Sequence, residues 1–222
     1  LRVVGNPNEF AKKYYEQGAD ELIFMDNVAS LYGRNNLYDV IHEATKNVFI
    51  PITVGGGIRS IKDANKVLRA GADKIAINTA AVRNPKIISE LSKIFGSQCI
   101  VVSIEAKKIN DKYWEVYTLN GREKTGINLI DWIKRIIECG AGEILLTSVD
   151  RDGTKKGFDT ELIKVSSKIC SIPLIVSGGC GSLNDIIDLK KKKLNIDTIA
   201  LGTVLHYEKT KIQDAKRNLR RI

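Results

Sequence analysis

The chain has 222 residues, of which 43% are hydrophobic, and its formal net charge is +9. This composition predicts one large folded domain and excludes a disordered chain. No apolar run approaches the ~20 residues that a membrane helix needs, so we expect no membrane insertion. The excess lysines lie at residues 190–193 and near the end of the chain without interleaved aromatic residues, which favours a solvated basic face over a nucleic-acid-binding surface.

Four cysteines lie far apart in the sequence and form no CxxC pair. Such spacing is typical of reduced thiols in a cytoplasmic protein, and not of a disulfide framework or a zinc site. We therefore expect a cytoplasmic protein with no metal site and no cofactor. The cysteines are Cys99, Cys139, Cys170 and Cys180.

The first recognisable element is a helical pattern over residues 7–18, and no strand pattern precedes it. Short β-rich runs then alternate with amphipathic stretches along the chain. Apolar strands separated by helices predict an α/β fold with a parallel sheet covered by helices. The predicted strands cover residues 21–26, 51–56, 74–79, 99–106, 143–149, 173–179 and 197–204.

The number of strands decides which α/β architecture we expect. Seven strands are predicted, whereas a (β/α)8 barrel has eight. Because the first helix has no strand before it, we predict a single (β/α)8 TIM barrel over residues 1–222 whose first strand is missing from this chain. An open doubly wound sheet is the alternative, and its ligand would also lie beyond the carboxyl ends of the strands.

One insertion interrupts the alternation after the strand that ends near Glu105. Residues 113–118 alternate in polarity, and an Asn-Gly turn follows at residues 120–121. This pattern predicts a small antiparallel hairpin inserted after the strand. Its tip would lie on the face where the strands end.

The stretch "PITVGGGIRS" at residues 51–60 recurs as "PLIVSGGCGS" at residues 173–182. Ser60 and Ser182 are predicted helix N-caps. Each copy then runs through a helix to another strand, "DKIAINTAA" in the first and "DTIALGTVL" in the second. This internal repeat predicts two related half-barrels, roughly residues 1–98 and 99–222.

Both copies place glycines between a strand and a helix, and small polar residues at the end of the next strand. Glycine lets backbone N–H groups approach a bound anion closely, and a helix N-terminus attracts it. Two such turns at one barrel mouth predict a substrate with a phosphate at each end, although a glycine pair can also serve only a tight turn. The residues are Gly56, Gly57, Asn78 and Thr79 in the first copy, and Gly178, Gly179, Gly202 and Thr203 in the second.

Ionisable side chains at strand ends are candidates for acid–base chemistry between the two turns. Each can instead be a loop cap or an ion-pair partner, above all Asp150 and Asp159. The two histidines, His42 and His206, are predicted to be structural. The candidates at strand ends are Asp26, Glu105, Thr147, Asp150, Arg151 and Asp152.

Charged residues also mark the opposite ends of three strands. Glu21, Lys74 and Glu143 each open a predicted strand just before its apolar run. In a barrel these charges would ring the bottom, away from the glycine turns. Solvated strand ends are the alternative, and periodicity alone does not distinguish the two.

Several stretches together resemble the cyclase subunit of imidazole glycerol phosphate synthase. They include "DELIFMD", "GADKIAINTAA", "GAGEILLTSVDRDGTKKGFD" and "PLIVSGGCG", and the resemblance covers essentially the whole chain. It implies a (β/α)8 barrel that takes ammonia from a glutaminase partner subunit. It also implies that this ammonia is used to cyclise and cleave a bis-phosphorylated ribosyl-aminoimidazole intermediate of histidine synthesis.

The resemblance implies roles for the marked residues. Glu21, Lys74 and Glu143 correspond to a ring of charges through which ammonia enters the barrel. Two phosphate sites and the strand ends that contact the substrate correspond to the remaining positions. One phosphate site is Gly57, Asn78 and Thr79; the other is Gly153, Gly179, Gly202 and Thr203; the substrate-contacting strand ends are Asp26, Thr147 and Asp152.

Two departures from the family leave the activity open. The family uses two catalytic aspartates, of which the first lies on the strand that this chain lacks. The second corresponds to Glu105, whose carboxylate lies one methylene, ~1.5 Å, further out. The stretch "MDNVASLYGRNNL" resembles paralogues that, with a similar glutaminase, are thought to supply ammonia for amidation of surface-polysaccharide sugars. A non-cyclising paralogue of this kind and a sugar-phosphate isomerase barrel are therefore the alternatives to a cyclase.

Overall fold

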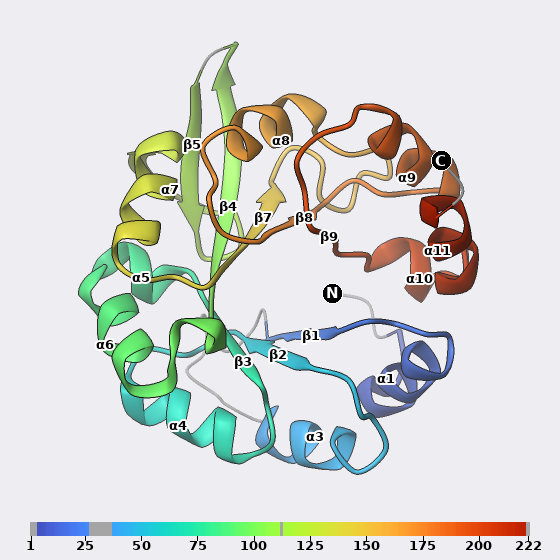
Figure 1. The fold of residues 1–222 in the computed structure, drawn as a ribbon, viewed down its shortest axis with the longest axis horizontal. Coiled ribbons are helices and arrows are strands. Elements are labelled where there is room, and N and C mark those ends of the chain that lie inside the picture. The colour runs from blue at the N-terminus through green and yellow to red at the C-terminus, as the bar shows by residue number, and fades with distance from the viewer. Residues whose placement is uncertain (1–3, 27–36, 112, 221–222) are drawn as a thin grey trace.

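The computed structural model describes residues 4–26, 37–111 and 113–220. Parallel strands form one curled sheet in the order β1-β2-β3-β4-β7-β8-β9, and helices surround it (Figure 1). Each segment predicted as a strand contains one. The strands are β1 Leu22–Met25, β2 Ile52–Gly55, β3 Lys74–Ile77, β4 Ile100–Asn110, β7 Glu143–Ser148, β8 Leu174–Ser177 and β9 Thr198–Ile199.

The strand order distinguishes the two architectures that the sequence allows. Along this sheet the order never reverses, whereas a doubly wound sheet contains a switch point. The fold is therefore of the TIM-barrel type, and the predicted (β/α)8 class is confirmed. Strands β1 and β9 are the two edges, and no pairing joins them within the described ranges.

The amphipathic stretches form helices whose apolar faces pack against the sheet. Ile88 and Leu91 of α6 and Ile133 and Ile136 of α7 are completely buried there. The helices are α1 Pro7–Glu16, α3 Leu37–Ala44, α4 Ile61–Arg69, α5 Thr79–Arg83, α6 Lys86–Phe95, α7 Leu129–Glu138, α8 Thr160–Ser167, α9 Leu183–Lys191, α10 Thr203–His206 and α11 Ile212–Arg220.

A second, smaller core fills the inside of the curled sheet. Because side chains alternate along a strand, Ala76 lies on the same face of β3 as Lys74, and Leu145 lies on the same face of β7 as Glu143 and Thr147. The apolar layer thus separates charged side chains at the strand starts from polar ones at the strand ends. Its buried members are Ala76, Val101, Leu145 and Ile175.

Several predicted strands are longer than the observed ones. Thr79 and Thr203, predicted in strands, are the first residues of the short helices α5 and α10. The residues before them, Asn78 and Gly202, have φ and ψ of −124° and −82°, and −120° and −84°, respectively. These angles lie outside the β region, so the chain leaves the sheet and starts a helix at both places.

The predicted hairpin is confirmed, and it is larger than expected. Strand β4 continues past the sheet and pairs antiparallel with β5 (Tyr113–Thr118), which in turn pairs with β6 (Glu123–Asn128). The chain therefore reverses twice. The end of the β4–β5 pair projects from the barrel (Figure 1), whereas the β5–β6 turn lies back over Glu105, to which Gly121 donates a hydrogen bond.

The first helix packs against residues near the end of the chain. The Tyr14 hydroxyl and His206 Nδ1 are 2.8 Å apart, and the ring of Phe10 meets His206 edge to face. Burial, followed by the charge of Glu208, raises the pKa of Tyr14 to about 12, and burial lowers the pKa of His206. A protonated tyrosine and a neutral imidazole therefore share this hydrogen bond, which joins α1 to α10.

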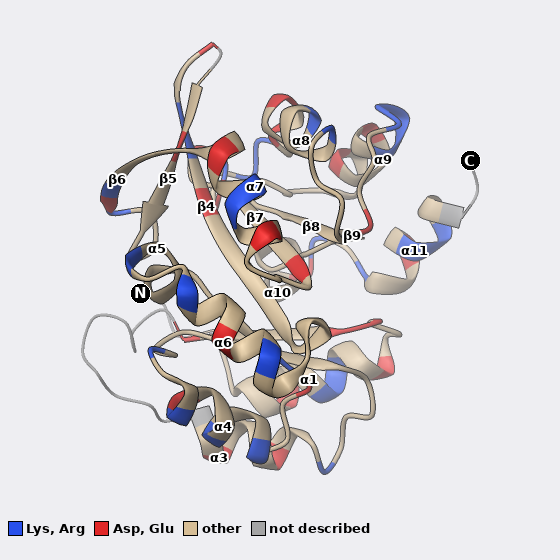
Figure 2. Cartoon of the chain, turned by 60° about the vertical axis from the view of Figure 1, so that its left-hand side comes forward, with Lys and Arg blue, Asp and Glu red and all other residues tan. Residues whose placement is uncertain are grey.

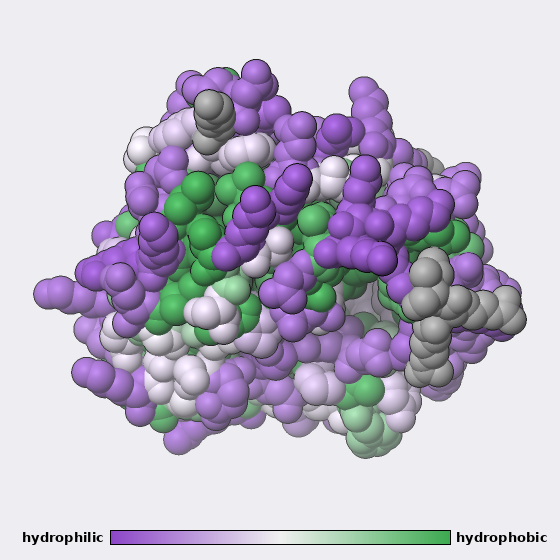
Figure 3. All heavy atoms as spheres, turned by 45° about the horizontal axis from the view of Figure 1, so that its top comes forward, coloured by the Kyte–Doolittle hydropathy of each residue, from purple (hydrophilic) through white to green (hydrophobic). Residues whose placement is uncertain are grey.

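Charged side chains of both signs are spread over the helices, and α9 ends in lysines (Figure 2). Apolar side chains gather among hydrophilic ones on one face of the molecule (Figure 3). All four cysteines are free, as predicted. Among the described residues, no helix combines the length and the apolar character that crossing a bilayer requires.

Candidate active site

A cavity of about 320 Å³ opens at the carboxyl ends of β1 to β4. It brings together six of the residues predicted from the sequence and several that were not predicted. The predicted residues are Asp26, Gly56, Gly57, Asn78, Thr79 and Glu105; the others include Arg59, Arg83, Ser103 and Asn120.

The first glycine turn is shaped by a close approach to the end of β1. Gly56 and Gly57 have φ of +99° and +70°, which side-chain-bearing residues rarely adopt. A Cβ atom on Gly56 would lie 2.2 Å from the backbone oxygen of Asp26. Glycine is therefore required here, and the backbone of the turn itself forms part of the cavity wall.

The start of α5 also lines the cavity. The first N–H groups of a helix have no intrahelical acceptor, so they are available to an anion. The side chains beside them are held by the hairpin: Asn78 Nδ2 donates to Tyr117 O at 3.3 Å, and Thr79 Oγ1 accepts from Leu119 N–H at 3.5 Å. Asn78 Oδ1 is buried and has no hydrogen-bond partner within the described part of the chain.

Glu105 and Asp26 are the carboxylates among the described residues that line the cavity, and Glu105 Oε2 accepts a 2.8 Å hydrogen bond from Gly121 N–H. Burial raises the pKa of Glu105, the hydrogen bonds from Gly121 and Asn78 lower it, and the charge of Asp152 raises it; the net pKa lies above the usual value. Such a carboxyl group holds its proton closer to neutral pH than an ordinary glutamate, which suits proton transfer.

The second glycine turn is covered by the loop between β7 and α8. Gly178 and Gly179 have φ of +94° and +96°. A Cβ on Gly178 would lie 3.1 Å from Ser148 O, and one on Gly179 would lie 2.2 Å from Gly157 O. Of the second predicted group, Thr147 pairs with Glu105 and Ser177 in neighbouring strands, and Asp152 lies near enough to shift the pKa of Glu105.

The second group lies at the same end of the sheet as the cavity but does not line it. Because β2 and β8 belong to one parallel sheet, both glycine turns leave it at the same end. The described residues that line the 320 Å³ cavity do not include the second group. Its members are Thr147, Asp152, Gly153, Gly178, Gly179, Gly202 and Thr203.

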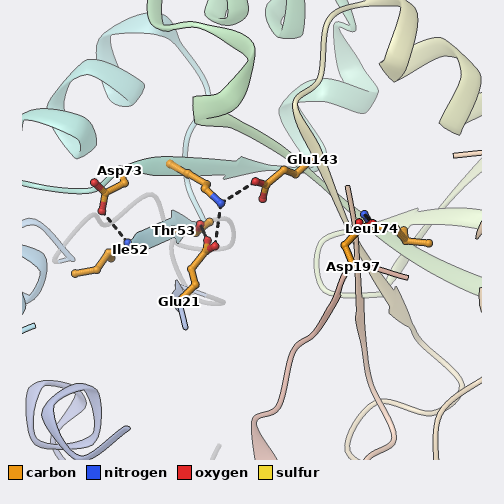
Figure 4. Close-up of polar contacts among 8 residues, drawn as sticks. Glu21, Ile52, Thr53, Asp73, Glu143, Leu174 and Asp197 are labelled. Carbon is orange, nitrogen blue, oxygen red and sulfur yellow. Dashed lines mark hydrogen bonds and ion pairs between the residues drawn. The ribbon is translucent and has the colours of Figure 1, made fainter. Parts of the chain in front are cut away.

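The three charged residues at the strand starts meet in one cluster (Figure 4). Lys74 Nζ lies 2.9 Å from Glu21 Oε2 and 2.7 Å from Glu143 Oε1, and the three side chains are only 17–22% exposed. Burial lowers the pKa of Lys74, but the hydrogen bonds and charges of Glu143 and Glu21 outweigh it, so the net pKa is raised. These residues are therefore paired, and not separately solvated.

Two further carboxylates have structural partners, as one alternative anticipated. Asp150 Oδ2 accepts from Lys108 N–H at 2.7 Å. Asp159 is the N-cap of α8, where its Oδ1 accepts from Leu162 N–H at 3.1 Å. Both line a separate groove of about 690 Å³ outside the first cavity.

Sequence reasoning missed the arginines and the hairpin turn that border the cavity. Arg59 directly follows the first glycine turn, and Arg83 ends α5, yet both positions are typical of solvated arginines. The Asn-Gly turn was identified as a turn, but its contact with Glu105 depends on how the hairpin folds back. The stretch at residues 27–36, which favoured the polysaccharide paralogue, lies outside the described residues.

The curled parallel sheet and the cavity at its carboxyl ends define an enzyme of the (β/α)8-barrel class. The particular family follows from comparison with known proteins: residues 1–211 match the family described as "Histidine biosynthesis protein", and the chain belongs to this family.

Three relatives carry the name imidazole glycerol phosphate synthase subunit HisF. The protein from Legionella pneumophila is 62% identical over 185 residues, which cover 83% of this chain and 87% of the relative. The proteins from Bacillus cereus strains Q1 and G9842 are 51% and 50% identical over 220 residues, which cover 99% of this chain and 87% of each relative. The family resemblance seen in the sequence is thereby confirmed.

Proposed function

We propose that this chain is the cyclase subunit of an imidazole glycerol phosphate synthase. It uses ammonia to convert a bis-phosphorylated ribosyl-aminoimidazole carboxamide intermediate into imidazole glycerol phosphate and aminoimidazole carboxamide ribotide. The observation that carries the proposal is 51% identity over 99% of the chain to a protein named as the HisF subunit of that synthase. The cavity at the carboxyl ends of the strands supports it.

Two cradles would hold the two phosphates of this substrate. For the first, support comes from the left-handed glycine turn and the start of α5, which line one cavity. Arg59 and Arg83 border the same cavity and add positive charge. The first cradle comprises Gly56, Gly57, Asn78 and Thr79; the second comprises Gly153, Gly178, Gly179, Gly202 and Thr203.

Glu105 would transfer protons during the reaction. Ammonia adds to the substrate, the new nitrogen closes the imidazole ring as one substrate oxygen is lost as water, and the ribotide leaves, so protons must be moved between nitrogen and oxygen atoms. A buried carboxyl group with a raised pKa can give and take them near neutral pH. Asp26, Thr147 and Asp152 would contact the substrate beside it.

The relatives are named as a subunit of a synthase, so a partner subunit is implied. We propose that this partner is a glutaminase docked where the strands start. Ammonia would then enter past Glu21, Lys74 and Glu143 and reach the cavity through the inside of the sheet. This reading gives the paired charges a role as a gate.

The alternatives from the sequence gain no support. None of the three relatives has a name that points to sugar amidation or to sugar-phosphate isomerisation. Most of the stretch "MDNVASLYGRNNL", which favoured the paralogue, falls in residues 27–36, which the structure does not describe.

Turnover of the bis-phosphorylated intermediate tests the proposal. The intact protein, supplied with this intermediate and ammonium at high pH, should release both products. Glu105→Gln should slow the reaction by about 10²–10⁴-fold, because general acid–base catalysis contributes that much. Asp150→Asn, outside the cavity, is the control. Binding of the intermediate without release of products by the unmodified protein would reject the cyclase.

Addition of a glutaminase subunit tests the gate. Lys74→Ala should change the glutamine-dependent rate and leave the ammonium-dependent rate unchanged, because only the first requires passage from the partner. Equal loss of both rates would show that Lys74 serves the fold or the cavity instead.

A further inference from the structure

The β5–β6 turn brings left-handed backbone to the cavity wall. Leu119, Asn120 and Gly121 follow one another with φ of +53°, +60° and +73°. Asparagine and glycine adopt such angles readily in a hairpin turn, whereas leucine rarely does, and strained backbone clusters at functional sites. Leu119 lines the cavity, as does Asn120, so the strained residue lies at the site itself.

Hydrogen bonds tie this turn to the two elements that carry the proposed chemistry. Gly121 N–H donates to Glu105 Oε2 at 2.8 Å. Leu119 N–H approaches Thr79 Oγ1 at 3.5 Å, and Asn78 donates to Tyr117 just before the turn. The turn therefore spans from the carboxylate on β4 to the start of α5.

We propose that Gly121 is a positioning residue, whose N–H holds the Glu105 carboxylate at the cavity wall. The inference deepens the proposed function and rests on it. A Cβ on Gly121 would lie 3.0 Å from Val149 Cγ1, so a side chain at this position would crowd Val149 and disturb the turn.

The electrostatic consequence has a definite sign. A backbone N–H directed at a carboxylate stabilises its charged form, so loss of this donor raises the pKa of Glu105. The charge of Asp152, on the β7–α8 loop, raises the pKa of Glu105, whereas the N–H donor lowers it. Asp26, Arg59 and Arg83 are the other charged residues among those described as lining the same cavity.

The hairpin offers a matched control. Gly126 has φ of +72°, close to that of Gly121, and its N–H also donates to a glutamate, Glu115 Oε1, at 2.8 Å. No atom lies within 4 Å of a Cβ placed there. Gly126→Ala therefore adds the same backbone strain to the same hairpin, away from the cavity.

Titration of the ligand-free protein tests the inference directly. The ¹³C-labelled glutamate carboxyl signals are followed by NMR against pH, and Glu105→Gln identifies the signal of Glu105. In Gly121→Ala the midpoint should rise by about 1 pH unit. In Gly126→Ala it should stay at the wild-type value. An unchanged midpoint in folded Gly121→Ala would overturn the inference.

Steady-state kinetics adds a readout that instability alone would not move. Gly121→Ala should lower kcat about 10–100-fold with little change in KM, and the pH profile should shift with the titration. If Gly121→Ala does not fold, Gly121→Ala in a Val149→Ala background makes room for the Cβ, with Val149→Ala as its reference. Because the titration needs no substrate, a shifted midpoint in a protein without cyclase activity would reject the proposed function and uphold the contact.

Discussion

The two copies of the repeated unit share a framework and differ in what covers their glycine turns. In the first copy Asp73 accepts from Ile52 N–H at 2.8 Å, and in the second Asp197 accepts from Leu174 N–H at the same distance (Figure 4). The backbone angles of Asn78 and Gly202 differ by only a few degrees. These contacts lie at strand starts and helix starts, where the fold requires them.

The loops over the two turns are different. The first turn opens onto the cavity. The second is overlaid by the β7–α8 loop, where Gly157 N–H donates to Gly179 O at 2.9 Å and a Cβ on Gly181 would meet Lys155 O at 2.6 Å. A repeated scaffold thus carries one open turn and one covered turn, so the loops, and not the scaffold, distinguish the two glycine turns.

Alanine at Gly56 should produce the largest difference between the copies. A Cβ at Gly56 would lie 2.2 Å from Asp26 O, and at the equivalent Gly178 it would lie 3.1 Å from Ser148 O. We expect Gly56→Ala to lower the free energy of unfolding by roughly 3 kcal/mol and Gly178→Ala by roughly half of that. Urea unfolding measures both, and equal losses would contradict the difference in packing.

Removal of the aspartates that hold the strand starts should affect both copies alike. Asp73→Ala and Asp197→Ala each leave a strand N–H without its acceptor, so each should cost about 1–3 kcal/mol. Urea unfolding of the two single variants and the double variant tests this. If only one of the two variants lost stability, the equivalent hydrogen bonds would not contribute equally in the two copies.

The helix caps should give a smaller, matched effect. Ser60 and Asp63 at α4, and Ser182 and Asp185 at α9, form the same arrangement of hydroxyl, carboxylate and N–H groups. Ser60→Ala and Ser182→Ala should each lower the free energy of unfolding by about 1 kcal/mol. Thermal unfolding would detect this, and retention of full stability in either variant would count against the cap.

The charge at the start of β3 should give the smallest effect, which is present at neutral pH and disappears at alkaline pH. Lys74 has a raised pKa, whereas the equivalent residue of the second copy is Thr198, which cannot ionise. Since the folded-state pKa of Lys74 is raised, its stabilising contribution is complete below pH 10.5, the ordinary lysine value, and is lost as pH rises from there through the higher folded-state pKa. The free energies of unfolding of wild type and Lys74→Met should therefore converge at strongly alkaline pH. A difference that stays constant with pH would contradict the pairing.

The sequence predicted features that depend on local pattern. Apolar runs located every parallel strand, and the charges at Glu21, Lys74 and Glu143 correctly marked the same end of the sheet. The ends of strands were less predictable. Apolar residues continue past Ile199, but the chain turns into α10 there, and nothing in the pattern marks that change.

Contacts made by tertiary folding could not be predicted. The hydrogen bond from Gly121 to Glu105 forms because β4 and β5 extend beyond the sheet and the chain reverses twice. The pairing register shifts within both the β4–β5 pair and the β5–β6 pair, and the alternation of residues in the sequence does not reveal these shifts. Likewise, the covering of Gly179 by Gly157 depends on the path of a loop.

The contact of Tyr14 with His206 has a consequence for synthesis of the chain. The two residues are 192 positions apart, so α1 leaves the ribosome roughly 10–40 s before its partner at translation speeds of 5–20 residues per second. During this interval Phe10 and Tyr14 of α1 lack their contacts with His206. The junction between α1 and α10 can therefore form only after nearly the whole chain has left the ribosome.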